Sequence, residues 1–217
     1  MNIEAARQSE DDRGLDRLLD AAEDAFSEKG YDGAGMKEIA RLSGTSQSLL
    51  HYHFGSKERL YEAVIARRSR KINAARHALL DRVPPDAPDA VERIFEALFR
   101  PPLGPEGRGR SYARIFAGLA AGGARDSELV RRYYDETARR FIAALAAARP
   151  EASPMAAARA YTMALGALVV ALSGEARTTR LAGDGGGRPA LLDDLVTYAT
   201  GGFAALIATS SSLGGKT

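Results

Sequence analysis

The stretch GTSQSLLHYHFGSKERL, residues 44–60, gathers polar side chains on one side of a short predicted helix. Residues three and four apart share a helix face, so the outward side chains are Gln47, Ser48, His51 and Tyr52. Leu50 and Phe54 form the opposite, apolar face, and Leu49 lies at the edge. An amide, a hydroxyl and an apolar edge match the groups that base pairs present in the major groove of DNA. The chemistry that this face offers is base recognition.

Two short helices are needed to position this face. The spacing of Met36, Ile39 and Ala40 predicts a helix of about two turns. Gly44 ends this helix, and Ser46 is a suitable N-cap for the next one, which carries the polar face. Two helices joined by so tight a turn predict a helix-turn-helix, whose second helix enters the major groove.

The charge distribution is consistent with phosphate binding. The net charge is only +2, but residues 29–83 hold eleven Lys or Arg against five acids, whereas residues 1–28 hold three Arg against nine acids. A local basic excess is typical of phosphate-binding domains, although a solvated helix face explains the charge equally well. Tyr52 and Lys57 are suited to phosphate oxygens, and Lys57 lies in the first turn of a helix, where anions are favoured. We expect both side chains to be exposed.

Other kinds of chemistry find little support in the sequence. The chain has no cysteine, which excludes disulfides, thiolate ligands and cysteine nucleophiles and suits a reducing cytoplasm. His51 and His53 point to roughly opposite sides of a helix and have no third ligand nearby, so we predict no metal site. No G-x-S-x-G or H-E-x-x-H motif is present, and only His77 is left as a general base. We therefore expect neither enzymatic activity nor a cofactor.

The rest of the chain has helical periodicity without alternating strand patterns, so we predict an all-α fold of about nine helices. A first helix ends at Gly30, and Pro101-Pro102 are expected to end the helix over 89–100. Further helices are predicted over 56–82, 112–121, 127–149, 153–173 and 191–208. The glycine-rich segment 183–189 has no lysine for a phosphate loop and is expected to be flexible.

The predicted organisation is a helix-turn-helix domain over 12–60 and a second helical domain over 61–208. Polar composition predicts disordered tails over 1–11 and 209–217. The longest apolar run, Tyr161–Leu172, is shorter than the roughly 20 residues of a membrane span. We therefore expect no membrane partner.

The run GYDGAGMKEIARLSGTSQSLLHYHFGSKERLYEAV resembles the DNA-binding domain of the TetR family of bacterial transcriptional regulators. The resemblance covers residues 12–64. The matching elements are the Phe26…Gly30-Tyr31 end of the first helix, Ile39-Ala40, Gly44-x-Ser46, Leu50-x-Tyr52-x-Phe54 and Ser56-Lys57-Glu58-x-Leu60. It implies that contacts to bases and phosphates come from Lys37, Gln47, Ser48, Leu49, His51, Tyr52 and Lys57.

Three positions depart from the family pattern. Ala34-Gly35 stand where the family usually has Thr-Thr or Thr-Ser, and a glycine N-cap offers no hydroxyl, so one phosphate contact is expected to be missing. Thr45 replaces a common hydrophobe and is expected to loosen packing slightly. Ser48-Leu49 replace a frequent Gly-Thr pair, which implies a different operator sequence.

The resemblance also implies that the C-terminal domain binds a small-molecule effector and forms a homodimer. Small residues of the last two long helices would allow close approach of the partner, namely Ala160, Ala164, Ala167, Ala171, Gly201, Gly202 and Ala205. An ordinary core within one chain is the alternative for these residues. The aromatic residues expected to line the effector pocket are Phe99, Tyr112, Phe116, Tyr133 and Tyr161, although aromatics at helical spacing are also common in cores. The scarcity of charge on these helices indicates an apolar effector.

The resemblance thus implies a cytoplasmic, ligand-responsive repressor that binds a palindromic double-stranded DNA operator as a homodimer and is released by its effector. An activator of the same fold is the first alternative. From other classes, a helical interaction module and a small-molecule-binding protein without DNA binding remain open.

Overall fold

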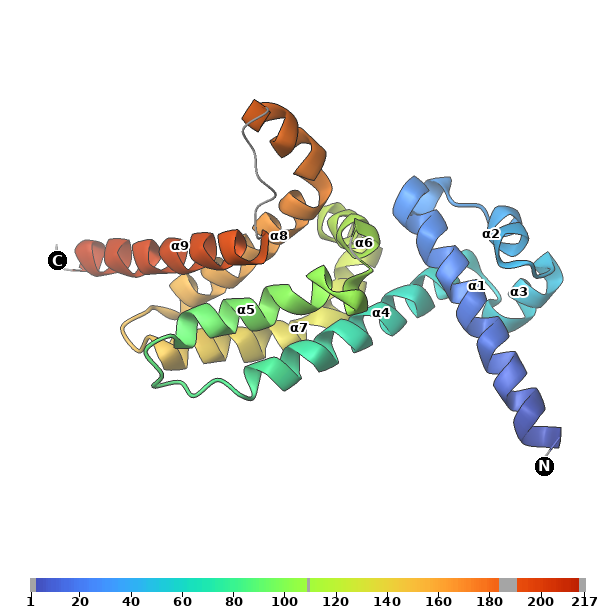
Figure 1. Ribbon diagram of the computed structural model, residues 1–217, viewed down its shortest axis with the longest axis horizontal. Helices are drawn as coiled ribbons and strands as arrows, with labels where there is room; N and C mark the ends of the chain where they lie inside the picture. The colour runs from blue at the N-terminus through green and yellow to red at the C-terminus, as the bar shows by residue number, and fades with distance from the viewer. Residues whose placement is uncertain (1–2, 109, 184–190, 215–217) are drawn as a thin grey trace. The chain divides into compact units, whose positions relative to one another are not determined.

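The computed structural model describes residues 3–108, 110–183 and 191–214, and these residues form nine α-helices, one 3-10 helix and no strand (Figure 1). The predicted all-α class is confirmed. The helices are α1 (Ile3–Gly33), α2 (Met36–Ser43), α3 (Gln47–Phe54), α4 (Lys57–Leu80), α5 (Ala90–Leu103), η1 (Pro105–Gly107), α6 (Arg110–Ala121), α7 (Ala124–Ala148), α8 (Pro154–Ala182) and α9 (Leu191–Gly214).

The chain forms two compact units, an N-terminal unit over Met1–Ser69 and a C-terminal unit over Arg70–Thr217. The division falls inside α4, as does the predicted boundary between residues 60 and 61, which lies nine residues earlier. A continuous helix gives no compositional sign of such a boundary. The predicted tails also differ, because α1 includes residues 3–11 and α9 includes residues 209–214.

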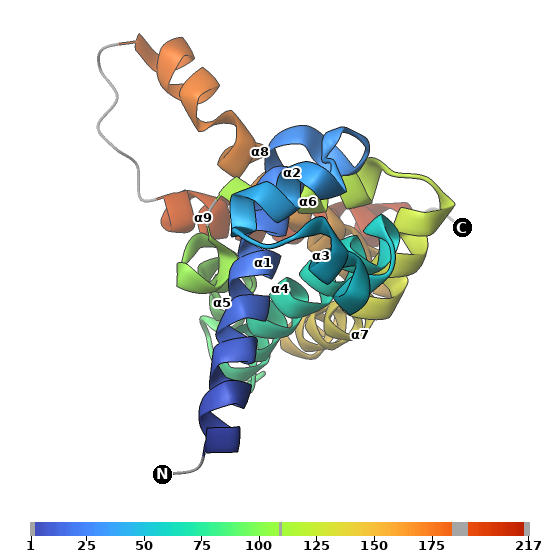
Figure 2. The ribbon, with the colours of Figure 1, turned by 90° about the vertical axis from the view of Figure 1, so that its right-hand side faces the viewer.

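The N-terminal unit is built on apolar residues at helical spacing. Its fully buried side chains include Leu18, Ile39, Leu50, Leu60 and Ile65. Figure 2 shows α2 and α3 side by side, joined by a short turn. Helix α1 is interrupted at Gly30, whose φ of 68° and ψ of 178° are readily adopted only by glycine. Beyond this break, the ring of Tyr31 packs against that of Tyr61, with centroids 5.0 Å apart.

In the C-terminal unit, α5, α7, α8 and α9 pack as neighbours around one apolar core (Figure 1). Phe95, Phe99, Phe141 and Phe203 are its largest fully buried apolar side chains. The Phe95 and Phe99 rings stack with centroids 6.1 Å apart. The last turns of α8 extend away from this bundle, and residues 177–183 are exposed.

Helix α5 continues through Pro101-Pro102, so the prediction that these prolines end the helix was wrong. Both prolines lie in its last turn and are buried. Pro102 has no N–H to donate to the carbonyl of Leu98, four residues earlier. The guanidinium of Arg76, on α4, donates to that carbonyl through Nε at 2.9 Å. A side chain from another helix thereby replaces the missing backbone hydrogen bond.

Helices α8 and α9 are longer than predicted, and each contains a long apolar stretch. By length and composition alone, Pro154–Leu172 and Leu191–Thr209 are long enough to span a bilayer, whereas the apolar run Tyr161–Leu172 within the first of them is shorter. Core helices pass the same test, and α8 and α9 pack against each other. The buried share falls from 44% in the first stretch to 22% in the second, which leaves apolar surface on α9. The predicted loop 183–189 falls, apart from Gly183, outside the described residues.

Candidate nucleic-acid interface

A tight, hydrogen-bonded turn joins α2 to α3. Gly44 ends α2 in the left-handed conformation (φ 71°, ψ 22°), which costs glycine little. The next N–H, of Thr45, donates to the carbonyl of Ala40 at 3.0 Å. The hydroxyls of Ser43 and Thr45 are hydrogen bonded at 2.9 Å. Thr45 therefore takes part in the turn through hydrogen bonds of both its backbone and its side chain.

Helix α3 has the two faces that the sequence predicted. Ser46 is its N-cap, and its hydroxyl accepts the N–H of Leu49 at 3.1 Å. Leu50 is fully buried and Phe54 is half-buried. The opposite face is exposed and carries Gln47, Ser48, Leu49, His51 and Tyr52, with Tyr52 83% exposed. Lys37 is exposed on α2, and the N-cap of α2, Gly35, makes no side-chain hydrogen bond.

The imidazole of His51 is oriented by the end of its own helix. Its Nδ1 lies 3.1 Å from the carbonyl oxygen of Gly55. A carbonyl only accepts, so Nδ1 carries the proton of this bond and Nε2 is left as the atom that can meet another molecule. The ring therefore presents a defined atom on the exposed face.

Lys57 is half-buried, so the expectation that it is fully exposed was wrong. Its Nζ donates to the carbonyl of Asp32 at 3.1 Å and lies 4.7 Å from the centroid of the Tyr31 ring. The Tyr31 hydroxyl in turn donates to the carboxylate of Glu58 at 2.6 Å. The chain brings Tyr31 and Asp32 to the start of α4 after the break at Gly30. An ammonium has three N–H donors, so Lys57 retains capacity for a phosphate oxygen.

Two exposed arginines near this face were not singled out from the sequence. Arg41 follows Lys37 by one helical turn on α2 and is exposed. Arg59 is exposed in the first turns of α4, and its guanidinium lies next to Gly55. The i, i+4 spacing of Lys37 and Arg41 is the signal from which the first of them could have been found.

A cavity of about 580 Å³ lies among α6, α7 and α8 in the C-terminal unit. Of the predicted pocket residues, Phe116 and Tyr161 line it. Phe99 and Tyr133 do not line it; Phe99 is fully buried in the core, because the inward face of α5 packs there. The side chain of Tyr112 lies outside the described part of the chain. Tyr134, which was not among the predicted residues, also lines the cavity, and its ring packs edge-on against Phe116 with centroids 5.1 Å apart.

The predicted dimer residues divide between the core and the surface. Ala160 and Ala164 are buried within their own chain, where the alternative of an ordinary core applies. Ala167 and Ala171 are half-buried, whereas Gly201, Gly202 and Ala205 are exposed. The same two helices also expose large apolar side chains that the prediction did not include, namely Met155, Met163, Val170, Leu181 and Tyr198. We call Met163, Tyr198, Gly201, Gly202 and Ala205 the apolar α8–α9 surface.

A helix-turn-helix whose second helix exposes a polar face defines the class of DNA-binding proteins, and a helical unit with a partly open cavity follows it along the chain. Known families agree with this arrangement. Residues 18–64 match the description "Bacterial regulatory proteins, tetR family", and residues 92–202 match "Tetracyclin repressor-like, C-terminal domain". The chain therefore belongs to the TetR family of bacterial DNA-binding transcriptional regulators.

Individual relatives match mainly over part of the chain. The HTH-type transcriptional activator FasR of Mycolicibacterium smegmatis is 39% identical over 84 residues, which cover 38% of this chain and 37% of FasR. The HTH-type transcriptional repressor NicS of Pseudomonas putida is 33% identical over 81 residues, 37% of this chain and 38% of NicS. The chain thus spans less than two fifths of the length of either relative.

The fold is shared over nearly the whole chain. The crystal structure of the TetR family regulator PfmR from Thermus thermophilus superposes with a TM-score of 0.62 at 20% identity. The superposition covers 87% of this chain and 97% of PfmR. At this identity the likeness concerns the fold alone.

Proposed function

We propose that this protein regulates transcription in the cytoplasm by binding an operator as a homodimer, with α3 in the major groove. The observation that carries the proposal is the exposed row of polar side chains on α3, held by the turn at Gly44 and by the buried Leu50. Polar groups exposed in this way can meet base edges. The proposal assigns no catalytic activity to the chain.

Each residue of the face has a distinct role in the proposed complex. Gln47 and Ser48 read base edges, and Leu49 contacts a thymine methyl group. Tyr52 and Lys57 bind phosphate oxygens, and Lys37 adds a phosphate contact from α2. His51 offers its Nε2, the acceptor of the neutral imidazole, to a donor on a base edge. Arg41 and Arg59 extend the basic border of the same face. The seven predicted contact residues remain part of the proposal, with these two arginines as additions.

A dimer is proposed because one short helix reads few base pairs. The apolar α8–α9 surface supports this step, since contiguous exposed apolar side chains mark interaction sites. Two-fold symmetry would present two copies of α3 to successive major grooves about 34 Å apart, and the operator would be palindromic.

The cavity of the C-terminal unit is proposed as the effector site. Its volume is that of a small-molecule pocket. Apolar and aromatic side chains dominate its lining, with Asp135 and Thr162 as polar members, so the effector is proposed to be largely apolar. An effector that prefers one arrangement of the dimer shifts the population away from DNA. We propose that the protein represses transcription, as the relative NicS is named a repressor. Activation is the alternative, because the relative FasR is named an activator.

The proposal is tested by selecting duplexes from a random-sequence library with the purified protein, followed by footprinting of the enriched sequence. The expected result is a palindrome whose half-sites are about one helical turn apart. Enrichment of no sequence, at low salt and after removal of bound small molecules, would contradict the proposal and favour a protein that binds ligands or partners without DNA.

A further inference from the structure

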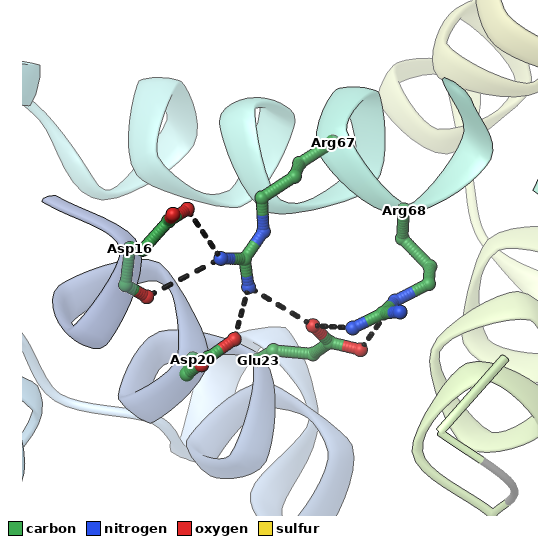
Figure 3. Close-up of polar contacts among 5 residues, drawn as sticks. All are labelled: Asp16, Asp20, Glu23, Arg67 and Arg68. Carbon is green, nitrogen blue, oxygen red and sulfur yellow. Dashed lines mark hydrogen bonds and ion pairs between the residues drawn. The ribbon is translucent and has the colours of Figure 1, made fainter. Parts of the chain in front are cut away.

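Two arginines of α4 meet three acids of α1 inside the N-terminal unit (Figure 3). Arg68 holds Glu23 through two bonds, from Nε to Oε1 at 2.8 Å and from Nη2 to Oε2 at 2.6 Å. Arg67 Nη2 also donates to Glu23 Oε2 at 3.2 Å and to Asp20 Oδ1 at 2.7 Å. Arg67 Nη1 donates to the backbone carbonyl of Asp16 at 3.2 Å.

The cluster has a buried centre and an exposed rim. The side chain of Glu23 is 0% exposed and that of Arg68 is 8% exposed, whereas Asp20 and Asp16 are 50% and 70% exposed. The three acids lie four and three residues apart and therefore share one face of α1. The central pair is a two-bond guanidinium–carboxylate contact, which tolerates little rotation of either helix.

Apolar packing alone fixes the relation of two helices less strictly, because it has no direction. A buried ion pair adds little net stability, since desolvation of both charges offsets their attraction, but such pairs can specify one arrangement among several. The Glu23–Arg68 pair is therefore suited to setting geometry.

We propose that the Glu23–Arg68 pair is a clamp that holds α4 on α1 in the one arrangement from which α3 fits DNA. The inference rests on the proposed function. Neither residue belongs to the exposed face of α3, so both are positioning residues that act through the helices they join. Arg67 also donates to Glu23, whereas its contacts with Asp16 and Asp20 lie at the exposed rim and are not part of the clamp.

The position of the clamp near the end of the N-terminal unit determines which part of α4 moves together with α1. Arg68 directly precedes Ser69, the last residue of the N-terminal unit. The clamp thus ties the first turns of α4, Lys57–Arg68, to α1, which packs against α2 of the helix-turn-helix.

Electrostatics and positioning predict opposite effects for Glu23→Gln. The substitution removes a negative charge from a unit that binds polyanionic DNA, so charge alone strengthens binding. Loss of the clamp weakens binding to the specific sequence, because α3 no longer holds one position. Asp16→Asn is the matched control, since it makes the same charge change at the rim and leaves the Glu23–Arg68 pair intact.

The experiment compares the wild type, Glu23→Gln, Asp16→Asn and the double variant Glu23→Leu/Arg68→Met. Affinity for the selected operator and for unrelated DNA is measured at a temperature where circular dichroism shows each protein to be folded. The double variant leaves no unpaired buried charge and is expected to fold even if Glu23→Gln does not.

The clamp predicts that Glu23→Gln and the double variant bind the operator about tenfold more weakly or worse, roughly the loss of one base contact. Their binding to unrelated DNA is retained, and Asp16→Asn loses nothing. A folded double variant with wild-type operator affinity would overturn the clamp while leaving the proposed function in place. A wild type that binds no DNA would instead refute the proposed function itself.

Discussion

The Nε of Arg76 donates to the carbonyl of Leu98 at 2.9 Å, and this bond joins α4 to α5. It falls on the carbonyl that would accept from the N–H of residue 102 if that residue were not proline. Arg76 is 1% exposed, and its Nη2 has no hydrogen-bond partner among the described residues. The bond explains both why a charged side chain lies in the core and why α5 continues past two prolines.

Replacing Arg76 by methionine is expected to lower the free energy of unfolding by about 1–3 kcal/mol, because the Leu98 carbonyl is left buried without a donor. Pro102→Ala restores a backbone N–H four residues after that carbonyl. The pair Arg76→Met/Pro102→Ala should therefore recover part of the loss in urea unfolding. If Arg76→Met lowers the free energy of unfolding equally with Pro102 and with Ala at position 102, the missing N–H of the proline is not the reason for the bond.

Lys57→Ala is expected to reduce stability as well as DNA affinity. Loss of the ammonium above the Tyr31 ring costs about 0.5–1 kcal/mol, and the hydrogen bond to Asp32 is lost with it. Tyr52→Ala, at an exposed position, should leave the free energy of unfolding within about 0.5 kcal/mol of the wild type. If the unfolding temperatures of the two variants differ equally from that of the wild type, the contacts of Lys57 do not stabilise the fold.

The stability of the C-terminal unit is expected to fall as the pH drops below 6.5. Burial, and then the nearby Arg140, lower the pKa of His77 below its usual 6.5, while its Nε2 lies 2.9 Å from the Thr137 hydroxyl. The unfolded chain therefore binds more protons than the folded chain between the lowered pKa and 6.5. The contribution of neutral His77 to the free energy of unfolding is therefore fully present above pH 6.5 and is lost as the pH falls from 6.5 through the lowered pKa.

His77→Gln should flatten this dependence when urea unfolding is followed at about pH 7.5 and about pH 5.5. His53→Gln serves as the control, because it removes an exposed histidine without touching Thr137. A pH dependence that is unchanged in His77→Gln would assign the effect to other groups.

Gly202→Leu is expected to break the homodimer without unfolding the chain. A Cβ added at Gly202 meets nothing within 4 Å in its own chain, and the leucine side chain would lie on the apolar α8–α9 surface. Sedimentation equilibrium should show the dimer dissociation constant rising by about tenfold or more, that is, by about 1.4 kcal/mol. Gly118→Leu is the matched control, since that glycine on α6 has equally open surroundings. If Gly202→Leu dimerises with the dissociation constant of the wild type, the dimer interface does not include the apolar α8–α9 surface.

Local features of the fold and of the DNA face were predictable from the sequence. Ser46 caps α3 as expected, and Ser153 caps α8 in the same way, because an N-cap depends on residues within one turn. The exposed face of α3 follows from helical periodicity, with Leu50 pointing inward. Such inferences need no knowledge of distant contacts.

Features that depend on residues far apart in the chain were not predictable. Lys57 is half-buried because Asp32, 25 residues earlier, returns to it after the break at Gly30. Helix α5 passes its prolines because Arg76 supplies a donor from another helix. Ala164 and Gly202 looked alike as small residues of apolar helices, but only packing places the first in the core and the second at the surface.

The most direct test of DNA recognition by α3 is fluorescence anisotropy with the selected operator, comparing the wild type with Gln47→Ala/Tyr52→Ala at two salt concentrations. We predict that wild-type binding weakens with salt at a log–log slope of about −0.9 per phosphate neutralised. The double variant should bind about tenfold more weakly or worse while its thermal unfolding is unchanged. Operator binding by the double variant with wild-type affinity would contradict the account, because the DNA would then be read by another surface.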